Sequence, residues 1–355
     1  AIRDARMLPK SKPTMDRFAW PRPKKPKYLT AEIANRRFSS TLRTSNRDIG
    51  DLATDEEQLN RYGLPIWRTE ADIAAALGLT ESQLQHYCIH RKRETSPHYV
   101  KFAIPKRSGG HRLIHAPKSR LKSILRKLNQ QLVQKLPVSS HAHGFLAGRS
   151  VASNARLHSG KQVVVKLDLK DCFPSIHFGR VRGLLIALGY GYPVSAALAV
   201  LMTESERQPV VAEGKTYFVP VGPRTCVQGA PTSPGLCNAV MMRMDRRLAG
   251  LAKKFQFQFT RYADDLTFSG DDPLVTQKLL RFAREIVEAE GFRINGRKTR
   301  VQRRGRCQRV TGVVVNDQVG LSRKERRKIR AAIHQLDPSD PLAVQRLQGK
   351  VAYLT

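Results

Sequence analysis

The chain has 355 residues, with 63 Lys or Arg against 29 Asp or Glu and a formal net charge of +34. With 41% hydrophobic residues it can bury a substantial core, which excludes a disordered basic tail. It contains no run of 18 apolar residues and does not open on a secretory signal, so the sequence predicts a soluble cytoplasmic protein with no membrane partner. The charge favours a polyanion, nucleic acid ahead of lipid.

The beginning of the chain is predicted to contain an extended segment followed by two helices. Residues 1–68 form a basic N-terminal arm, because prolines between positions 13 and 26 break any long helix. Residues 69–89 show helical periodicity in two pieces separated at Gly78, and Thr80 and Gln83 have the spacing of a capping box. A helix-turn-helix that reads DNA is an alternative for this pair of helices.

Hydrophobic periodicity and turn residues predict the elements that follow. They are a hairpin over 99–104 and 112–114, a basic helix over 121–136, a strand over 163–169, helices over 181–188 and 193–203, a hairpin of 255–259 with 266–268, a helix over 277–290, strands over 292–294 and 309–315, and a helix over 322–334. Strands and helices alternate irregularly, so the predicted fold class is α+β.

The charge distribution indicates a surface for a nucleic-acid backbone. Residues 95–167 contain 14 Lys or Arg and no Asp or Glu, where the average composition would place about six acids. A basic face without a partner is the alternative, but unneutralised repulsion of this size costs stability. Residues 300–330 are also strongly basic, and their helix is expected to turn one side towards phosphates.

Three aspartates stand at the ends of predicted strands. Asp168 closes the strand over 163–169, and Asp264 and Asp265 lie at the tip of the second hairpin. Adjacent aspartates in a turn are often only a polar turn, but burying three unpaired carboxylates would be strongly unfavourable. Two Mg²⁺ ions, for which Mn²⁺ can substitute, would compensate the charge, with the backbone of Leu169 as a further ligand. The pattern predicts metal-dependent phosphoryl transfer.

Tyr262 to Asp265 read YADD, and with this motif the chain resembles a reverse transcriptase. Five blocks stand in the family's order: IPKRSGGHRLI at 104–114, KLDLKDCFPSI at 166–176, QGAPTSP at 228–234, YADD at 262–265 and GFRINGRKT at 291–299. The resemblance implies an RNA-directed DNA polymerase shaped as a right hand. Its parts are N-terminal helices and fingers over 69–165, a palm over 166–317 with interleaved fingers residues, and a basic helical thumb over 318–355 that the given sequence is expected to cut short.

The resemblance also implies roles for single residues in catalysis. Asp168, Asp264 and Asp265 are the catalytic metal ligands. Lys298 corresponds to a lysine near the departing pyrophosphate and is a candidate general acid, with an ordinary surface lysine as the alternative.

Other residues in the family's blocks are expected to bind the incoming deoxynucleotide. Lys106 and Arg112 clamp the triphosphate across the first hairpin. Phe173 excludes a 2′-hydroxyl and so selects dNTPs. A short loop supports the nascent base pair, where glycine permits close backbone approach; it comprises Gln228, Gly229 and Ala230.

Two further motifs are characteristic of bacterial retron reverse transcriptases: NAxxH at 154–158 and VTG at 310–312, and AHGFLAGRS at 142–150 is similar to the same group. A retron enzyme copies part of a structured noncoding RNA, which is both template and primer, from the 2′-hydroxyl of an internal guanosine. Its partners are an RNA–DNA hybrid and a branched, RNA-linked single-stranded DNA product. An antiphage role with an effector protein is the associated expectation.

The retron motifs themselves are candidate RNA contacts. Asn154 and His158 share one face of a predicted helix, where they contact the RNA or brace the palm. Val310, Thr311 and Gly312 precede the thumb, and the glycine allows the backbone to approach an RNA stem. Two alternatives stay open for the whole chain: a group II intron or abortive-infection reverse transcriptase, and, from another class, a non-catalytic RNA-binding scaffold.

Overall fold

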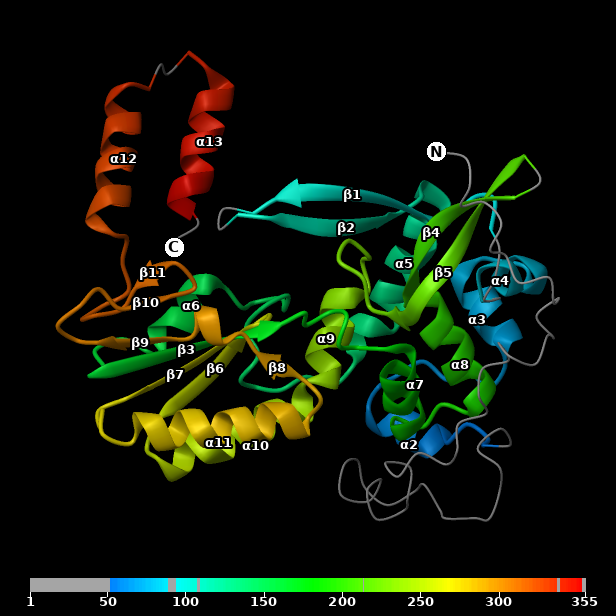
Figure 1. Cartoon of the computed structure of the whole chain (residues 1–355), viewed down its shortest axis with the longest axis horizontal. Helices are drawn as coiled ribbons and strands as arrows, with labels where there is room; N and C mark the ends of the chain where they lie inside the picture. The colour runs from blue at the N-terminus through cyan, green and yellow to red at the C-terminus, as the bar shows by residue number, and fades with distance from the viewer. Residues whose placement is uncertain (1–51, 89–93, 107–108, 213, 337–338, 353–355) are drawn as a thin grey trace, which may run out of the picture. The chain divides into compact units, whose positions relative to one another are not determined.

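A five-stranded antiparallel sheet organises the fold of this protein, which is described by a computed structural model (Figure 1). The structure describes residues 52–88, 94–106, 109–212, 214–336 and 339–352, so most of the arm predicted over 1–68 lies outside these ranges. Residues from Ala53 onward form one compact unit. Helices and antiparallel strands are mixed along the chain, so the predicted α+β class is confirmed.

The central sheet has the strand order β6-β7-β3-β8, and β9 also pairs with β3. β3 (Val163–Lys170) is central because its β-branched and leucine side chains are buried along most of its length. Its neighbours are β6 (Gln258–Tyr262), β7 (Asp265–Gly270), β8 (Arg293–Ile294) and β9 (Arg300–Arg303).

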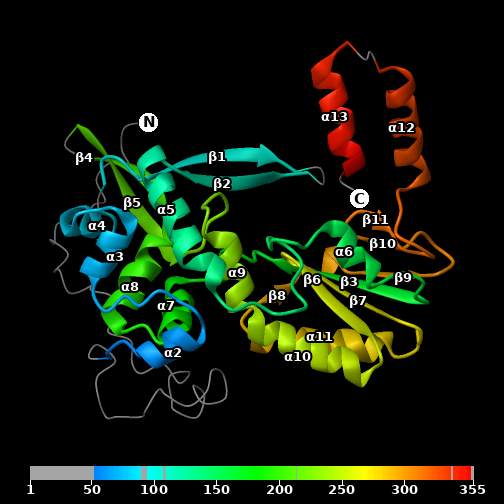
Figure 2. The same ribbon diagram turned by 180° about the vertical axis from the view of Figure 1, so that it is seen from behind.

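Two helices cover one face of this sheet, as both views show (Figures 1 and 2). They are α10 (Met242–Lys254), which packs on β6, and α11 (Thr276–Ala289), which packs on α10 and β8. Each is amphipathic and buries one stripe, Met244 and Leu248 in α10 and Leu279 and Ala283 in α11. This packing fixes the sheet from below and leaves the ends of β3 and β7 free to carry polar groups.

Three short helices begin the described chain: α2 (Glu56–Arg61), α3 (Glu70–Leu77) and α4 (Glu81–Cys88). The break between α3 and α4 is at Gly78, whose φ of 69° is the left-handed conformation that glycine adopts at helix ends. The predicted capping box is present, since the Thr80 and Gln83 side chains each accept a hydrogen bond from the other's backbone N–H.

The first hairpin and its following helix form as predicted. β1 (Tyr99–Pro105) pairs with β2 (His111–Pro117), and α5 (Ser119–Gln131) follows, continued by a 3₁₀ turn, η5 (Val133–Lys135). The helix predicted over 121–136 therefore ends earlier than expected. Two further helices lie close to the predicted ranges, α7 (Phe178–Ala187) and α8 (Tyr192–Leu201), whereas α6 (Val151–Arg156) ends before His158, so the helix expected to carry both Asn154 and His158 is shorter than predicted.

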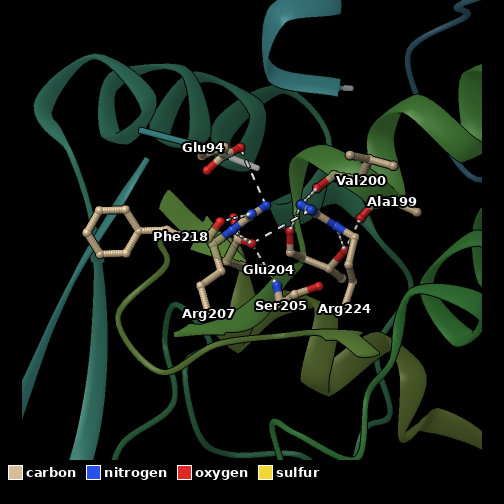
Figure 3. Close-up of polar contacts among 9 residues, drawn as sticks. Glu94, Ala199, Val200, Glu204, Ser205, Arg207, Phe218 and Arg224 are labelled. Atoms are coloured by element: carbon tan, nitrogen blue, oxygen red, sulfur yellow. Dashed lines mark hydrogen bonds and ion pairs between the residues drawn. The ribbon is translucent and has the colours of Figure 1, made fainter. Parts of the chain in front are cut away.

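A long hairpin of β4 (Glu204–Ala212) and β5 (Lys215–Thr225) was not predicted. At its base, Glu204, Arg207 and Arg224 are almost fully buried and pair with one another and with Glu94 from the preceding chain (Figure 3). Arg207 lies 3.4 Å from both Glu94 and Glu204, and Arg224 lies 3.7 Å from Glu204. Arg224 also donates to the carbonyl of Val200, at 2.8 Å. These contacts hold the hairpin to the preceding chain.

The sequence interpretation was wrong at two strands. Phe255 belongs to the end of α10 and Phe257 precedes the strand, so the strand predicted over 255–259 begins at Gln258. The segment 309–315 is not one strand but a tight hairpin of β10 (Arg309–Val310) and β11 (Val313–Val314). Its two-residue loop has positive φ at both positions, which breaks the strand and reverses the chain.

The remaining elements complete the chain. α9 (Ser233–Val240) precedes α10, a 3₁₀ turn η6 (Gly296–Lys298) links β8 to β9, and α12 (Arg323–His334) packs against α13 (Pro341–Ala352). α12 begins at the predicted place, where Ser322 and Glu325 form a capping box. Within the described ranges, no helix is long and apolar enough to cross a membrane.

Candidate active site

The three predicted aspartates meet at one end of the central sheet. Asp168 on β3 is paired directly opposite Asp265 on β7, and Asp264 stands in the loop between β6 and β7. Residues directly opposite in an antiparallel pair have Cα atoms about 4.5 to 5.5 Å apart and project their side chains to the same face. The backbone of Leu169 joins the same place, because its N–H donates to the carbonyl of Asp264 at 2.9 Å.

The loop that carries Asp264 is a two-residue hairpin turn. Tyr262 pairs with Asp265, so Ala263 and Asp264 alone reverse the chain. Ala263 has a φ of 56°, in the left-handed region that favours glycine. Backbone strain of this kind persists only where surrounding contacts impose it, which indicates that the turn is held by its neighbours.

The carboxylates lie in a poorly solvated, mutually repulsive environment. Burial raises the pKa of Asp264 above its ordinary value, and the charge of Asp168 adds to the shift. Burial also raises the pKa of Asp265, with contributions from both other aspartates. Nearby cations oppose these shifts, Lys298 and Arg112 at Asp264 and Lys166 at Asp265. The site is thus short of positive charge.

Asp168 is engaged by two side chains from the segment after β8. Lys298 places its Nζ 2.8 Å from Asp168 Oδ1, and Asn295 Nδ2 lies 3.4 Å from Oδ2. The ion pair with Asp168 raises the pKa of the Lys298 ammonium, so this lysine carries a proton beside the carboxylates. Lys298, expected near the departing pyrophosphate, thus lies beside the aspartates.

The nucleotide-binding candidates lie on two elements that touch each other. Arg112 is exposed on β2 opposite Ile104, and Lys106 follows β1 at the same end of the hairpin. Gln228 accepts a hydrogen bond from the backbone N–H of His115 at 2.8 Å. Gly229 lies so close to β2 that an added Cβ would stand 2.6 Å from the His115 carbonyl oxygen, which explains why this loop needs glycine.

Two other candidates of this group occupy different environments. Phe173 is half-buried in the turn that follows β3, five residues after Asp168. Ala230 is buried beneath its loop, so its side chain packs inside rather than facing a base.

The NAxxH and VTG motifs meet each other in the fold. Asn154 lies 3.5 Å from Thr311 Oγ1, and His158 bonds Ser269 and Thr260 at 2.7 Å each. Asn154 and His158 are both 0% exposed, so of the two predicted alternatives the structure supports bracing the palm. The alternative prediction, that these two side chains contact RNA directly, is therefore wrong.

The VTG hairpin divides into a buried and an exposed part. Val310 is 0% exposed and packs with Val164, Val313 and Val315, so its side chain anchors the hairpin. Thr311 is half-buried and Gly312 is exposed at the tip of the β10–β11 turn. The motif thus presents its two loop residues on a buried apolar base.

Comparison with known proteins identifies the family. The family described as reverse transcriptase (RNA-dependent DNA polymerase) matches residues 104–315. The chain is 60% identical over 354 residues to the retron Mx65 reverse transcriptase of Myxococcus xanthus, covering 99% of this chain and 82% of that protein. This chain belongs to the retron reverse transcriptases. It is also 43% identical to the retron Mx162 reverse transcriptase of the same organism, over 86% of this chain and 67% of that one.

Among solved structures, telomerase from Candida albicans with a fragment of telomeric RNA aligns with 69% of this chain and 51% of its own, at 13% identity and a TM-score of 0.45. The retron reverse transcriptase is an RNA-directed DNA polymerase, as the sequence blocks predicted. Enzymes of this family use divalent metal ions.

The residues at the site fit such an ion by their chemistry. Three carboxylates converge, and burial and mutual repulsion raise the pKa of Asp264 and Asp265, which a cation would reverse. In the described ranges, no three His, Cys, Asp or Glu residues already stand as a ready-made metal group, and Lys298 occupies one Asp168 oxygen. The retron enzyme thus carries the carboxylates that a divalent ion would need, and one of them, Asp168, is paired with Lys298.

Sequence reasoning missed the residues that hold the turn from behind. Arg261, immediately before Tyr262, is 0% exposed and pairs with Asp245 on α10. A signal was available, because Arg261 shares the strand face of the buried Phe259, and a charge on an inward face requires a partner. The acidic partner lies 16 residues away on a helix that was not predicted, so the pair could not be named.

Proposed function

We propose that Asp168, Asp264 and Asp265 hold two Mg²⁺ ions and form the polymerisation centre of this retron reverse transcriptase. The observation that carries the proposal is the register of the central sheet, which pairs Asp168 with Asp265 beside the Asp264 turn. The backbone of Leu169 completes the set of ligands. When bound, the metal pair supplies activation of the primer hydroxyl and neutralisation of the phosphates in an in-line displacement.

The chain's own groups have separate tasks in this proposal. Lys298, protonated and 2.8 Å from Asp168, delivers its proton to the departing pyrophosphate. Lys106 and Arg112 clamp the triphosphate from the end of the β1–β2 hairpin. Support comes from Arg112, whose charge acts on Asp264 and so lies within electrostatic reach of the centre.

The base and sugar of the nucleotide are positioned by two neighbouring segments. Phe173 excludes a 2′-hydroxyl from its place after β3. Gln228 and Gly229 support the nascent base pair with their backbone, which their close approach to β2 holds still. Ala230 contributes by packing beneath the loop.

We assign the parts of the polymerase hand accordingly. The helices and hairpins over 69–165 belong to the fingers, 166–317 to the palm with interleaved fingers residues, and 318–355 to the thumb. Support comes from α12, a basic helix that buries none of its residues and follows the VTG hairpin directly. Of the arm predicted over 1–68, only residues 1–52 are assigned to contacts with RNA or an effector, because the chain from Ala53 onward belongs to the compact unit and buries Leu59 and Trp67 in it.

The substrate we propose is a cognate structured noncoding RNA that serves as both template and primer. Synthesis starts from an internal 2′-hydroxyl and yields branched, RNA-linked single-stranded DNA, in antiphage defence with an effector protein. The names of the retron relatives support this proposal, as does the acid-free basic segment 95–167. Thr311 and Gly312, at the tip of their hairpin, are the RNA contacts of the VTG motif.

Primer extension with Mg²⁺ tests the catalytic assignment. Asp264→Asn keeps the size of the side chain and removes its charge, so we expect loss of DNA synthesis with RNA affinity within about tenfold of wild type. Primer extension at the wild-type level by this variant would contradict the catalytic role of Asp264. Binding of RNA without extension by the wild-type protein would favour the non-catalytic scaffold.

The nucleic acid that copurifies from the native host tests the retron substrate. We expect short single-stranded DNA that stays joined to RNA after protease treatment and leaves a ribonuclease-resistant branched nucleotide. DNA with an ordinary linear 5′ end would contradict the proposed priming and favour a group II intron or abortive-infection enzyme.

A further inference from the structure

Arg261 is the bulkiest fully buried side chain of the described fold, and its guanidinium group bonds both to helix residues and to the catalytic turn. Its Nε and Nη2 contact the two oxygens of Asp245 at 2.7 and 2.8 Å, a two-bond pair between two fully buried groups. A buried ion pair is costly to assemble and contributes little net stability compared with apolar packing. Its placement therefore calls for an explanation beyond stability.

The remaining guanidinium nitrogen reaches the turn itself. Arg261 Nη1 donates to the carbonyl of Ala263 at 3.1 Å and to Asn238 Oδ1 at 2.9 Å. The carbonyl belongs to the residue with positive φ, directly before Asp264. One rigid fork thus joins α10, through Asp245, and α9, through Asn238, to the strained residue of the turn.

Gly144 from the AHGFLAGRS segment lies against the same turn. Asn238 Nδ2 donates to the Gly144 carbonyl at 2.9 Å, so the same amide serves both the arginine and this glycine. The segment runs beside β6, with the His143 N–H donating to the Arg261 carbonyl and the Arg261 N–H to the His141 carbonyl, at 2.7 and 2.8 Å.

The approach of Gly144 leaves no room for a side chain. A Cβ added there would lie 2.6 Å from the backbone nitrogen of Ala263 and 3.3 Å from the Tyr262 carbonyl carbon. Both are backbone atoms, so the turn itself would have to move. The backbone of Gly144 is not in the left-handed region, so a substitution there acts through this contact and not through its own strain.

We infer that Gly144, Asn238 and Arg261 form a cradle that fixes the position of the Ala263–Asp264 turn and thereby the metal-binding geometry of Asp264. They are positioning residues, since they act on Asp264 through the turn. This inference rests on the proposed role of the three aspartates. It gives the AHGFLAGRS segment a task in catalysis that does not involve contact with substrate.

The test uses the full-length protein and two readouts. Mn²⁺ affinity of the free protein is measured by electron paramagnetic resonance, and kcat and KM are measured for single-nucleotide addition. Gly144→Ala is compared with Gly250→Ala, which lies exposed on α10 with nothing within 4 Å of its added Cβ. Asn238→Asp is a second variant, because it keeps an oxygen for Arg261 and replaces the donor to Gly144.

We expect Gly144→Ala to weaken Mn²⁺ binding and to lower kcat by about tenfold or more, with KM for the dNTP within about twofold, because the turn moves while the nucleotide clamp does not. Asn238→Asp shifts both readouts in the same direction, and Gly250→Ala shifts neither. If Gly144→Ala does not fold, Asn238→Asp decides by the same criteria.

Asp264→Asn, run in parallel, separates the inference from the function on which it rests. If Asp264→Asn loses Mn²⁺ affinity while folded Gly144→Ala and Asn238→Asp keep wild-type affinity and kcat, the cradle is refuted and the metal site stands. If Asp264→Asn itself keeps wild-type metal affinity and activity, the metal assignment fails first and the cradle with it.

Discussion

His158 shows how a polar residue of a sequence motif can act from inside the fold. Its ring nitrogens bond Ser269 on β7 and Thr260 on β6, so it ties the two strands of the catalytic hairpin together behind the turn. Burial, with a smaller contribution from His143, lowers its pKa to about 3. The imidazole is therefore neutral at neutral pH.

This lowered pKa predicts a pH dependence of stability. Above its ordinary pKa of 6.5 the histidine is neutral in both states, and as pH falls towards 3 the unfolded chain takes up a proton that the folded protein refuses. From pH 7 to pH 5 wild type should lose about 2 kcal/mol of unfolding free energy from this residue. Denaturant unfolding of His158→Gln at both values should show a loss smaller by that amount; identical losses would contradict the burial of a neutral ring.

Phe173 predicts a change in sugar selection. Phe173→Ala removes the ring that we place beside the sugar, so incorporation of ribonucleotides relative to deoxynucleotides should rise about 10- to 100-fold. The measurement is competitive single-nucleotide addition, with Phe178→Ala, on the following helix, as the matched control. Unchanged discrimination in Phe173→Ala would remove Phe173 from the role.

At this scale the sequence predicted the residues that lie close to a motif and missed those that act across the fold. Asp168, Asp264 and Lys298 were predicted because their blocks are specific, and they do converge. Arg261 and Asn238 were missed because their importance comes from partners on other elements, and burial is invisible in an isolated residue type.

Among the helices and strands too, those with local sequence signals were predicted and those held by distant contacts were missed. The helices at 70–77, 81–88 and 323–334 were predicted nearly to the residue, because caps and glycine signal their ends locally. The β4–β5 hairpin was missed, because Pro209 and Pro220 stand inside it and a buried ion network, not an apolar stripe, holds its base. The VTG hairpin was misread because two loop residues suffice to reverse the chain.

The buried network of the β4–β5 hairpin predicts a large effect of removing one charge. Glu204→Gln leaves Arg224 and Arg207 with less compensation in a region closed to water, so the unfolding free energy should fall by about 3 to 5 kcal/mol. Glu206→Gln is the matched control, two residues along the strand, because its pair with Lys101 is exposed and should contribute about 1 kcal/mol or less. Chemical denaturation measures both, and equal losses would show that the network carries no special stability.

At the scale of the whole molecule, the clearest feature of the sequence is its excess of Lys and Arg over Asp and Glu. The network of Glu94, Glu204, Arg207 and Arg224 is neutralised internally, and Arg243 and Arg247 pair with Glu290. The arginines of α12 lie exposed and have no ion pair with an acid among the described residues. The composition predicts an excess of positive charge, and the structure indicates that the exposed arginines of α12 are the ones left to bind RNA.

This distribution predicts the salt dependence of RNA binding. Replacing Arg323, Arg327 and Arg330 together with Gln should weaken binding of a stem-loop RNA and make the slope of log affinity against log salt less steep by up to about 3. Fluorescence anisotropy over a salt series measures it. A triple Gln variant on α10 and α11 removes the same charge and should change the slope less; its positions are Arg246, Arg281 and Arg284. Equal slopes for the two variants would contradict a specific role for α12.

The central claim, that three aspartates distant in sequence hold a pair of metal ions, is tested most directly by anomalous diffraction from crystals of the protein soaked with Mn²⁺ and a non-hydrolysable dNTP analogue. We predict two anomalous peaks about 3.5 to 4 Å apart, within about 2.2 Å of carboxylate oxygens of Asp168 and Asp264, with Lys298 displaced from Asp168. Peaks elsewhere, with Lys298 still paired to Asp168, would contradict the account.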